Sequence, residues 1–554
     1  MRVFWYNLGM ISTQINQGNY SAFQTYMLLQ IPENFDDIAM DDIFYTVLDI
    51  VKGVKLSDFI NFKKLRSDSY DRTALFTSLL LSLAIHGKLI SLRELERECR
   101  YDIRFRAILN GDMPSYKTFA RFINEDLSVD IEELLKRLNL YIMNQIYICR
   151  DILYIDGTKY EAYANKMTFV WKKATDKYYA KNYAKAINAI QDLNKYFKAQ
   201  GIDVCYSILK QMTFLYLFEI TDKLEDYIKS IGLQFVKGKG KRKTEIQRLY
   251  ERIAECAMKM MKYEIHYDLF RGRNSFSKTD PDAAFLHMKY DYYNHTNVFK
   301  PGYNVQMGVM DGYIMNIVIN TDANDMGSFK ATVEKYKEMY GEYPKGVCAD
   351  AGYGSKSNYR FCDQKQITAY IKYPSYEKEM QRRTEKNKFR SVQFDRDKRH
   401  MPICPAGHRF EIESTYTRYD EGNIPETIVR TRSTHCKDCP LRSKCTKSKN
   451  GRTMEINLVY EAQKSKVRNL LGSKEGKKIL RNRSVQSEGA FGILKEDYGF
   501  DCLSRRGETG VKIEVYCASI GFNIRKYHKA KLQEESERRK RKLEEEREKQ
   551  AAMN

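Results

Sequence analysis

Two short apolar segments, each followed directly by an aspartate, are the feature that most constrains how this chain folds. Ile152–Ile155 leads into Asp156, and Gly346–Ala349 leads into Asp350. Apolar runs of this length predict buried strands. In an open α/β sheet, the side chains just past the carboxyl ends of the central strands line the functional site. The sequence therefore predicts an α/β fold with two carboxylates at one edge of its sheet.

The segment between these aspartates indicates how the strands are ordered. Residues 303–309 alternate apolar and polar side chains, a tight turn follows, and residues 313–319 form a second predicted strand. An amphipathic helix is expected over 326–336 and a last strand over 368–372. If the first and fourth strands of this order lie side by side, the two aspartates meet at one end of the sheet. The ribonuclease-H-like fold has that layout.

A third carboxylate is expected from Glu488, which lies in a predicted helix. Arg481, Glu488 and Lys495 are spaced by seven residues, so they share one helix face. Val485 and Phe491 are expected to face a core instead. Two hard cations held about 4 Å apart for phosphoryl transfer need several carboxylate oxygens. The three acidic residues together would supply them.

The N-terminal part of the chain is predicted to be a helical DNA-binding domain. Residues 1–145 read as short helices with tight links, which suits a helix-turn-helix arrangement. The segment from Ser115 to Asn124 is the candidate recognition helix, and Tyr116, Lys117 and Arg121 are its candidate DNA contacts. A plain helical bundle is the alternative.

Residues 174–296 are interpreted as a helical insertion, because an apolar helical stripe runs from Ile246 to Met260. Before this stripe, residues 237–243 form a basic loop, which is either a solvated link or a phosphate-contacting loop. Just upstream of the insertion, Lys172 and Lys173 are further candidate DNA contacts.

Four cysteines are spaced as in a metal site. They are Cys404, Cys436, Cys439 and Cys445. Cys436 and Cys439 form a C-x2-C knuckle, and the other two could complete four thiolates around a tetrahedral zinc ion. His408 or His435 could replace one thiolate. A site with four protein ligands has no open position, so the zinc would be structural. The alternative is four reduced cysteines in a small β-rich insertion.

The composition favours a polyanionic partner. The 94 Lys and Arg residues against 72 Asp and Glu give a formal charge of +22, and nucleic acid is the usual partner of such a chain. The longest nearly apolar run, Ala74–Ile85, is well short of the roughly 20 residues that cross a bilayer. The first residues lack the pattern of a secretory signal. We therefore expect a cytoplasmic protein without a membrane partner.

The motifs around the acidic residues resemble those of the DDE-class transposases of bacterial insertion sequences. That family carries D-G-T-K, A-D-x-G-Y and E-x-x-F-G-x-x-K signatures, which here read as Asp156–Lys159, Ala349–Tyr353 and Glu488–Lys495. Asn165–Lys173 and Gly302–Gln306 are similar to further family segments, and the likeness covers roughly residues 40–530.

The resemblance implies a transposase that binds the terminal repeats of an element, cuts the DNA there and joins the free 3′ hydroxyl to target DNA. Asp156, Asp350 and Glu488 would hold two Mg²⁺ or Mn²⁺ ions, and Lys495 matches the family lysine. The partners implied are double-stranded DNA, at element ends and target, and a second copy of the chain, since two ends must be paired. Bound to DNA, the protein would be associated with the nucleoid.

One departure from the family pattern concerns the residues before Glu488. Related proteins carry a tyrosine seven residues and an arginine four residues before this glutamate, where this chain has Arg481 and Ser484. Arg481 or Arg483 would then supply the phosphate contact.

Two alternatives to a transposase are a ribonuclease-H-like nuclease without strand transfer and a domesticated DNA-binding regulator without catalysis. The three carboxylates argue against the regulator, and the N-terminal helices argue against a plain nuclease. The predicted architecture is an α/β ribonuclease-H-like core with an N-terminal all-helical DNA-binding domain, a helical insertion and a small β-rich insertion that contains the cysteines. The predicted boundaries are 1–145 for the N-terminal domain, 146–173 and 297–375 for the first two parts of the core, 174–296 for the helical insertion, 376–470 for the β-rich insertion, 471–528 for the C-terminal helices of the core and 529–554 for a charged tail.

Overall fold

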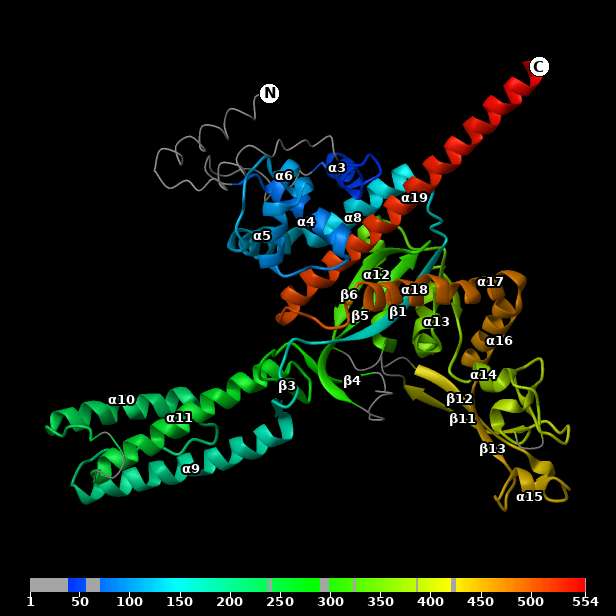
Figure 1. Ribbon diagram of the computed structural model, residues 1–554. Coiled ribbons are helices and arrows are strands. Elements are labelled where there is room, and N and C mark those ends of the chain that lie inside the picture. Colours follow the sequence, from blue (N-terminus) through cyan, green and yellow to red (C-terminus); the bar gives the residue numbers. More distant parts are fainter. Residues whose placement is uncertain are drawn as a thin grey trace, which may run out of the picture.

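The computed structural model describes residues 38–55, 70–236, 238, 242–288, 298–321, 325–384, 387–419 and 425–553 of the 554-residue chain. Helices surround a central mixed sheet, and two extensions project from it (Figure 1). The mixed α/β class predicted from the sequence is confirmed. No helix in these ranges is both long enough and apolar enough to cross a membrane.

Within the described ranges, the central sheet has six strands. They are β1 (Ile152–Glu161), β4 (Ala284–His287), β5 (Phe299–Met310), β6 (Tyr313–Asn320), β7 (Gly346–Ala349) and β8 (Thr368–Ile371). The order is β4-β5-β1-β7-β8, and β6 also pairs with β5, on the side away from β1. The pairs β1–β7 and β7–β8 are parallel, and the pairs that involve β5 are antiparallel. The first and fourth predicted strands, now β1 and β7, are therefore neighbours, as the sequence order suggested.

Strand β1 is longer than its sequence pattern predicted. The apolar run ends at Ile155, but pairing with β5 continues to Glu161, whereas the pairing with β7 stops at Ala349. Asp156 consequently lies inside a strand rather than after one. The second half of β1 extends past the end of its parallel neighbour, and this places the side chains beyond Ile155 at the edge of the sheet.

Helices from both ends of the chain cover the sheet. The N-terminal set is α3 (Ile43–Val54), α4 (Arg72–His86), α5 (Leu92–Tyr101), α6 (Ile103–Leu109), α7 (Tyr116–Arg121), the π-helical turn η4 (Phe122–Leu127) and α8 (Ser128–Gln145). The others are α12 (Ser328–Tyr340), α13 (Lys356–Gln364), α16 (Leu458–Gly472), α17 (Lys474–Arg483) and α19 (Gly507–Met553). Helices α8, α12 and α19 pack on β6, while α16 and α17 pack on β8.

The N-terminal helices share one hydrophobic core with the sheet. Helix α4 is buried from Leu75 to Ala84 because it lies against α19 as well as its own neighbours. Gly521 of α19 is needed there, since an added Cβ would lie 2.5 Å from the backbone oxygen of Leu83. Buried amides reinforce the junction: Asn523 donates to Asn139 (2.8 Å). The apolar interior is thus continuous from α3 to the sheet.

The helical insertion has a separate core. Its helices are α9 (Lys172–Ala199), α10 (Phe214–Ser230) and α11 (Glu245–Phe270), and they form the long extension in Figure 1. Side chains such as Ile190, Leu217 and Ile253 are fully buried among these three helices. Short strands β2 (Phe169–Trp171) and β3 (Ser275–Ser277) pair where the insertion joins the rest of the chain. Most of the basic loop expected at 237–243 lies outside the described residues.

The cysteine-containing insertion forms the second extension. It contains α14 (Tyr376–Met380), α15 (Arg442–Cys445) and the strands β9 (Asp395–Arg396), β10 (Pro402–Ile403), β11 (Glu411–Tyr419), β12 (Pro425–Arg432) and β13 (Thr453–Asn457). Strands β11, β12 and β13 make an antiparallel sheet, and β9 pairs with β10. The charged tail continues α19 as an exposed helix.

Candidate active site

Two aspartates lie at equivalent positions on adjacent parallel strands. In the β1–β7 ladder, Ile155 is opposite Ala349, so the next residues along the chain are Asp156, within β1, and Asp350, directly after β7. The side chain of Asp156 is only 20% exposed, whereas Asp350 is exposed just past the end of β7. The register of two short strands therefore brings together carboxylates that are almost 200 residues apart in the sequence.

The third carboxylate comes from a distorted helix that crosses this edge. After α17 the chain forms a π-helical turn, η9 (Ser484–Glu488), then one α-helical turn, α18 (Gly489–Gly492), and a second π-helical turn, η10 (Ile493–Asp497). A π-helical turn brings residues five apart face to face. Arg483 accordingly donates from Nη2 to Oε1 of Glu488 (2.8 Å).

Arg483 joins the third carboxylate to the first. Its Nη1 lies 3.9 Å from Oδ2 of Asp156, while its Nη2 holds Glu488. The π-helical turn also corrects the predicted helix face. Arg481 is exposed at the end of α17, and Val485, expected to face a core, is 72% exposed, because the wider turn rotates the side chains that follow it. Phe491 is buried as expected.

The charge state of Asp156 reflects this setting. The pKa of Asp156 is raised to about 6, chiefly by burial and also by the charges of Asp350 and Glu488. The N–H of Gly157, which donates to Asp156 Oδ1 (2.9 Å), and the guanidinium of Arg483 oppose the increase. Asp350 and Glu488 are thus close enough to influence the ionisation of Asp156.

A buried polar network supports the two aspartate segments, and the sequence reasoning missed it. Tyr353, three residues after Asp350, donates its hydroxyl to Oε1 of Gln306 on β5, and Gln306 donates to Asn304 (2.9 Å). Gln306 is fully buried, and its side chain fills the space that a Cβ at position 157 would occupy, at 2.2 Å. Gly157 is therefore required by its neighbour. The Gly302–Gln306 motif was the one signal that could have located this network.

Lys495 of η10 lies beside the carboxylates and packs against the second half of β1. Its Nζ donates to Oγ1 of Thr158 (2.5 Å) and sits 4.9 Å from the centre of the Tyr160 ring. It lines an open pocket with Lys159 and Lys300. This pocket is rich in cations next to a group of acidic side chains, an arrangement suited to a phosphate chain that passes over the site.

The donor set fits hard divalent cations, but the side chains are not closed around one. Across the described ranges, no three His, Cys, Asp or Glu side chains stand close enough together to hold a metal ion. At the carboxylates the reason is visible, because the guanidinium of Arg483 lies between Asp156 and Glu488 and supplies the positive charge there. Carboxylate oxygens are the ligands that Mg²⁺ and Mn²⁺ take, so these residues suit those ions once Arg483 turns away.

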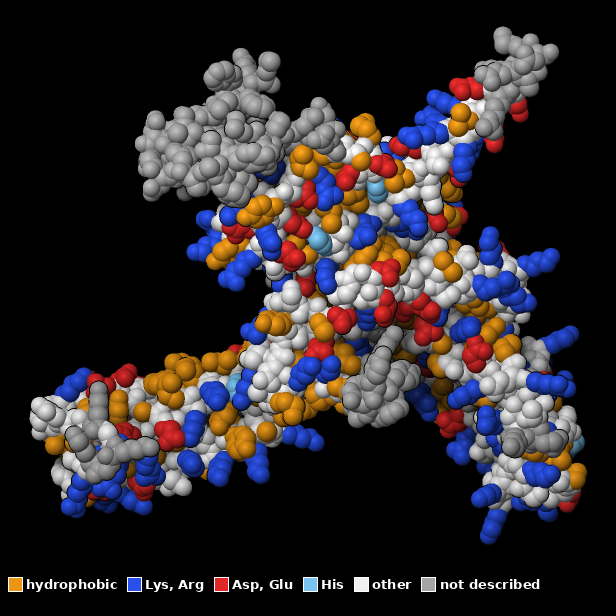
Figure 2. Space-filling view, viewed as in Figure 1, with side chains coloured by type: hydrophobic (Ala, Val, Ile, Leu, Met, Phe, Trp, Pro, Cys, Tyr) orange, Lys and Arg blue, Asp and Glu red, His pale blue; other side chains and the backbone are white. Residues whose placement is uncertain are grey.

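The candidate DNA contacts are accessible but are not gathered at the carboxylates. Lys117 and Arg121 are exposed on α7, whose other face buries Phe119. Tyr116 is half-buried, with the guanidinium of Arg93 5.3 Å from its ring centre. Lys172 and Lys173 are exposed at the start of α9. Figure 2 shows basic side chains spread over both insertions, with acidic side chains gathered near the middle of this face.

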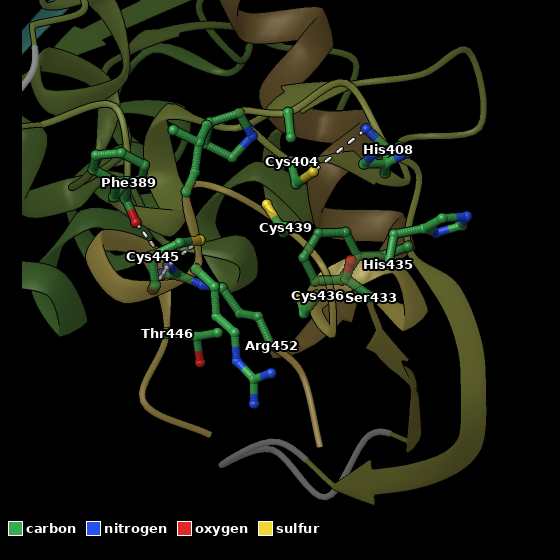
Figure 3. A pocket seen from close by; sticks show the side chains of 15 residues that line it. Phe389, Cys404, His408, Ser433, His435, Cys436, Cys439, Cys445, Thr446 and Arg452 are labelled. Carbon is green, nitrogen blue, oxygen red and sulfur yellow. Dashed lines mark hydrogen bonds between the residues drawn. The ribbon is translucent and has the colours of Figure 1, made fainter. Parts of the chain in front are cut away.

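The four cysteines predicted to bind zinc do come together around one pocket (Figure 3). His408 and His435 line the same pocket, and their rings stack 4.5 Å apart. All four cysteines are free thiols.

Comparison with known proteins bears on the C-terminal part of the chain. Residues 403–528 match the family model of the transposase DDE domain. The matched range contains the cysteines, Glu488 and Lys495, and begins after Asp156 and Asp350. Among curated proteins, none matches this chain. The family match confirms the resemblance to DDE-class transposases.

Proposed function

We propose that this chain is a DDE-class transposase that binds the ends of a DNA element, cuts them and joins the free 3′ hydroxyl to target DNA with the help of two divalent cations. The observation that carries the proposal is the meeting of Asp156, Asp350 and Glu488 at the end of two adjacent parallel strands. The sheet order β6-β5-β1-β7-β8, with β5 antiparallel to its neighbours, supports a ribonuclease-H-like core, since that fold places its acidic residues at this point.

The cations, when bound, would polarise the scissile phosphate and activate the attacking oxygen. The residues of this chain prepare the site for that chemistry. Burial raises the pKa of Asp156, and a positive partner at the site would offset that increase and favour the charged carboxylate. Arg483 holds the carboxylates together beforehand and, once displaced, is positioned to contact a phosphate. Lys495 lies beside them and can neutralise a neighbouring phosphate of the same strand.

DNA recognition is assigned to the N-terminal helices and to the excess of basic residues. Lys117 and Arg121 share the exposed face of α7, the arrangement of a recognition helix that enters a groove. The formal charge of +22 supplies the phosphate contacts that dominate affinity. A second copy of the chain is proposed because strand transfer requires both element ends in one complex.

The decisive experiment replaces Asp156, Asp350 or Glu488 with alanine and measures cleavage and binding of a labelled DNA that carries the element end. Each variant should lose cleavage and keep end binding, because the carboxylates act on the chemical step. Asp203→Ala is the matched control, since Asp203 is exposed in the loop after α9. A variant that cuts at the wild-type rate would remove that residue from the proposed metal-binding set.

Strand transfer is tested in the same reactions with an unlabelled plasmid as target. Covalent joining of the labelled 3′ end to the plasmid is expected. Cleavage without any joined product would favour a nuclease, and end binding without cleavage by the wild-type chain would favour a regulator.

A further inference from the structure

The cysteine-containing insertion has too small an apolar core to account for its fold. From α14 to β13, the buried apolar side chains in the described residues are Phe394, Pro402, Phe410, Ile428, Val429 and Ile456. Strand β11 is exposed along nearly its whole length. A unit with so small a core is usually stabilised by a disulfide or a metal in addition. The four cysteines here are free thiols, so no disulfide joins them in this structure.

The residues that could provide a metal site come from four separate turns. Cys404 follows β10, Cys436 ends the short helical turn η8 (Thr434–Cys436), Cys439 lies three residues later, and Cys445 ends α15. All four line one pocket, whose walls also include Phe389 and Leu441 (Figure 3). The surroundings of the sulfurs are therefore largely apolar, as in closed metal sites.

The turn at Cys404 already has the geometry of a metal-binding knuckle. Cys404 donates its N–H to the carbonyl of His408 (2.8 Å), and Gly407 donates to the carbonyl of Cys404 (2.9 Å). Gly407 has a φ of +83°, which favours glycine. The N–H of His408 consequently points at Sγ of Cys404, 3.3 Å away. A backbone N–H directed at sulfur stabilises a thiolate, the form that binds metal.

A positively charged side chain, Arg452, lies next to a second sulfur, that of Cys445. Nη1 of Arg452 lies 3.5 Å from Sγ of Cys445 and also donates to the carbonyls of Cys445 (2.7 Å) and Phe389 (2.8 Å). Partners of this kind orient ligands from outside the metal and offset the negative charge of several thiolates. The arginine is fixed by three acceptors, so its role is built into the fold.

We propose that Cys404, Cys436, Cys439 and Cys445 bind one structural zinc ion. Four thiolates are chosen over a histidine ligand because the rings of His408 and His435 are stacked on each other. As described, the sulfurs are not yet within ligand distance of a common point. Zinc binding requires the thiol side chains to turn about their Cα–Cβ bonds towards the pocket that they already line. The site lies in the insertion, away from β1 (Figure 1), and the proposal is independent of transposase chemistry.

The experiment is metal analysis of the full chain after gel filtration in a buffer with a weak chelator. About one zinc ion per chain is expected, as a closed four-ligand site implies. Replacement by Co²⁺ should give the intense near-ultraviolet thiolate-to-cobalt absorption and the visible bands of a tetrahedral ion. The cobalt measurement uses the unaltered chain and so does not depend on the folding of a variant.

Two variants and two controls complete the test. Cys404→Ser and Cys439→Ser should each reduce the bound zinc from about one ion to nearly none after the same wash. Cys502→Ser, at an exposed cysteine outside the insertion, and Asp156→Ala, at the carboxylates, should keep it. No zinc on the unaltered chain, iron in its place, or full retention by both cysteine variants would overturn the proposal. Zinc on a chain that fails to cut DNA would leave it intact.

Discussion

The raised pKa of Asp156 makes a prediction about stability that can be tested without any DNA. The pKa rises from 3.8 to about 6 in the folded chain, so folding is favoured when the carboxyl is protonated. That contribution is fully present below about pH 4 and is lost as the pH rises through about 6. A difference of about two pKa units corresponds to about 3 kcal/mol at neutral pH. Asp156→Asn, which is always neutral, should therefore stabilise the chain at neutral pH.

The assay is thermal unfolding of the unaltered chain and of Asp156→Asn in a buffer with EDTA, measured by calorimetry. At about pH 7.5 the transition of the core should lie roughly 5–10 °C higher in Asp156→Asn, since 1 kcal/mol shifts the melting temperature of a domain of 150–250 residues by about 2–4 °C. At about pH 4 the two proteins should melt together. Asp203→Asn, at an exposed aspartate, should show neither effect.

Added Mg²⁺ provides a second arm of the same experiment. The ion should raise the melting temperature of the unaltered chain at neutral pH and have a smaller effect on Asp156→Asn, because a ligand that binds only the folded state stabilises it. Two results would refute the conclusion that the buried charge of Asp156 destabilises the folded chain at neutral pH. One is destabilisation by Asp156→Asn at neutral pH, and the other is a difference in melting temperature that is the same at both pH values.

Two further predictions concern the supporting network and DNA binding. Tyr353→Phe leaves the buried Oε1 of Gln306 without its hydroxyl donor, so the change should cost about 1–3 kcal/mol of stability. It should also slow DNA cleavage more than it weakens end binding. An unchanged midpoint of urea unfolding would contradict this prediction. The affinity for the element end should fall about 10³-fold or more between about 50 and 200 mM salt if six or more phosphates are contacted. Lys117→Ala or Arg121→Ala should weaken end binding further, whereas the control Lys52→Ala, on the exposed side of α3, should not. An affinity that stays constant across this salt range would reject phosphate-dominated binding.

Much of the central sheet could be predicted because its signals are local. The segments at 152–155 and 346–349 have apolar runs of strand length, and the hairpin between them alternates with period two. The order of the elements suggested one layout, that of the ribonuclease-H-like fold, in which the first and fourth strands lie side by side, and β1 and β7 do so. These features need only neighbouring residues and a rule about connections. They were enough to place Asp156 beside Asp350.

The helix geometry around Glu488, the third carboxylate, could not be predicted in this way. A spacing of seven residues implied that Arg481 and Glu488 share a helix face, but a π-helical turn changes the repeat locally. Whether a helix contains such a turn depends on what packs against it, here β1 and β5, and not on its own sequence. The partner of Glu488 is consequently Arg483, five residues away. The tertiary contact between Gly157 and Gln306 was hidden for the same reason.

The distribution of the core separates parts of the molecule that must keep a fixed geometry from parts that need not. Helix α7 belongs to the same continuous apolar core as β1, so the candidate recognition helix is held at a constant position relative to the carboxylates. The helical insertion has a core of its own and contacts the rest of the chain at β2 and β3, and the cysteine-containing insertion has little apolar core of its own. If α7 contacts the DNA end as proposed, that end would reach the carboxylates at a fixed offset, because α7 and β1 belong to the same apolar core.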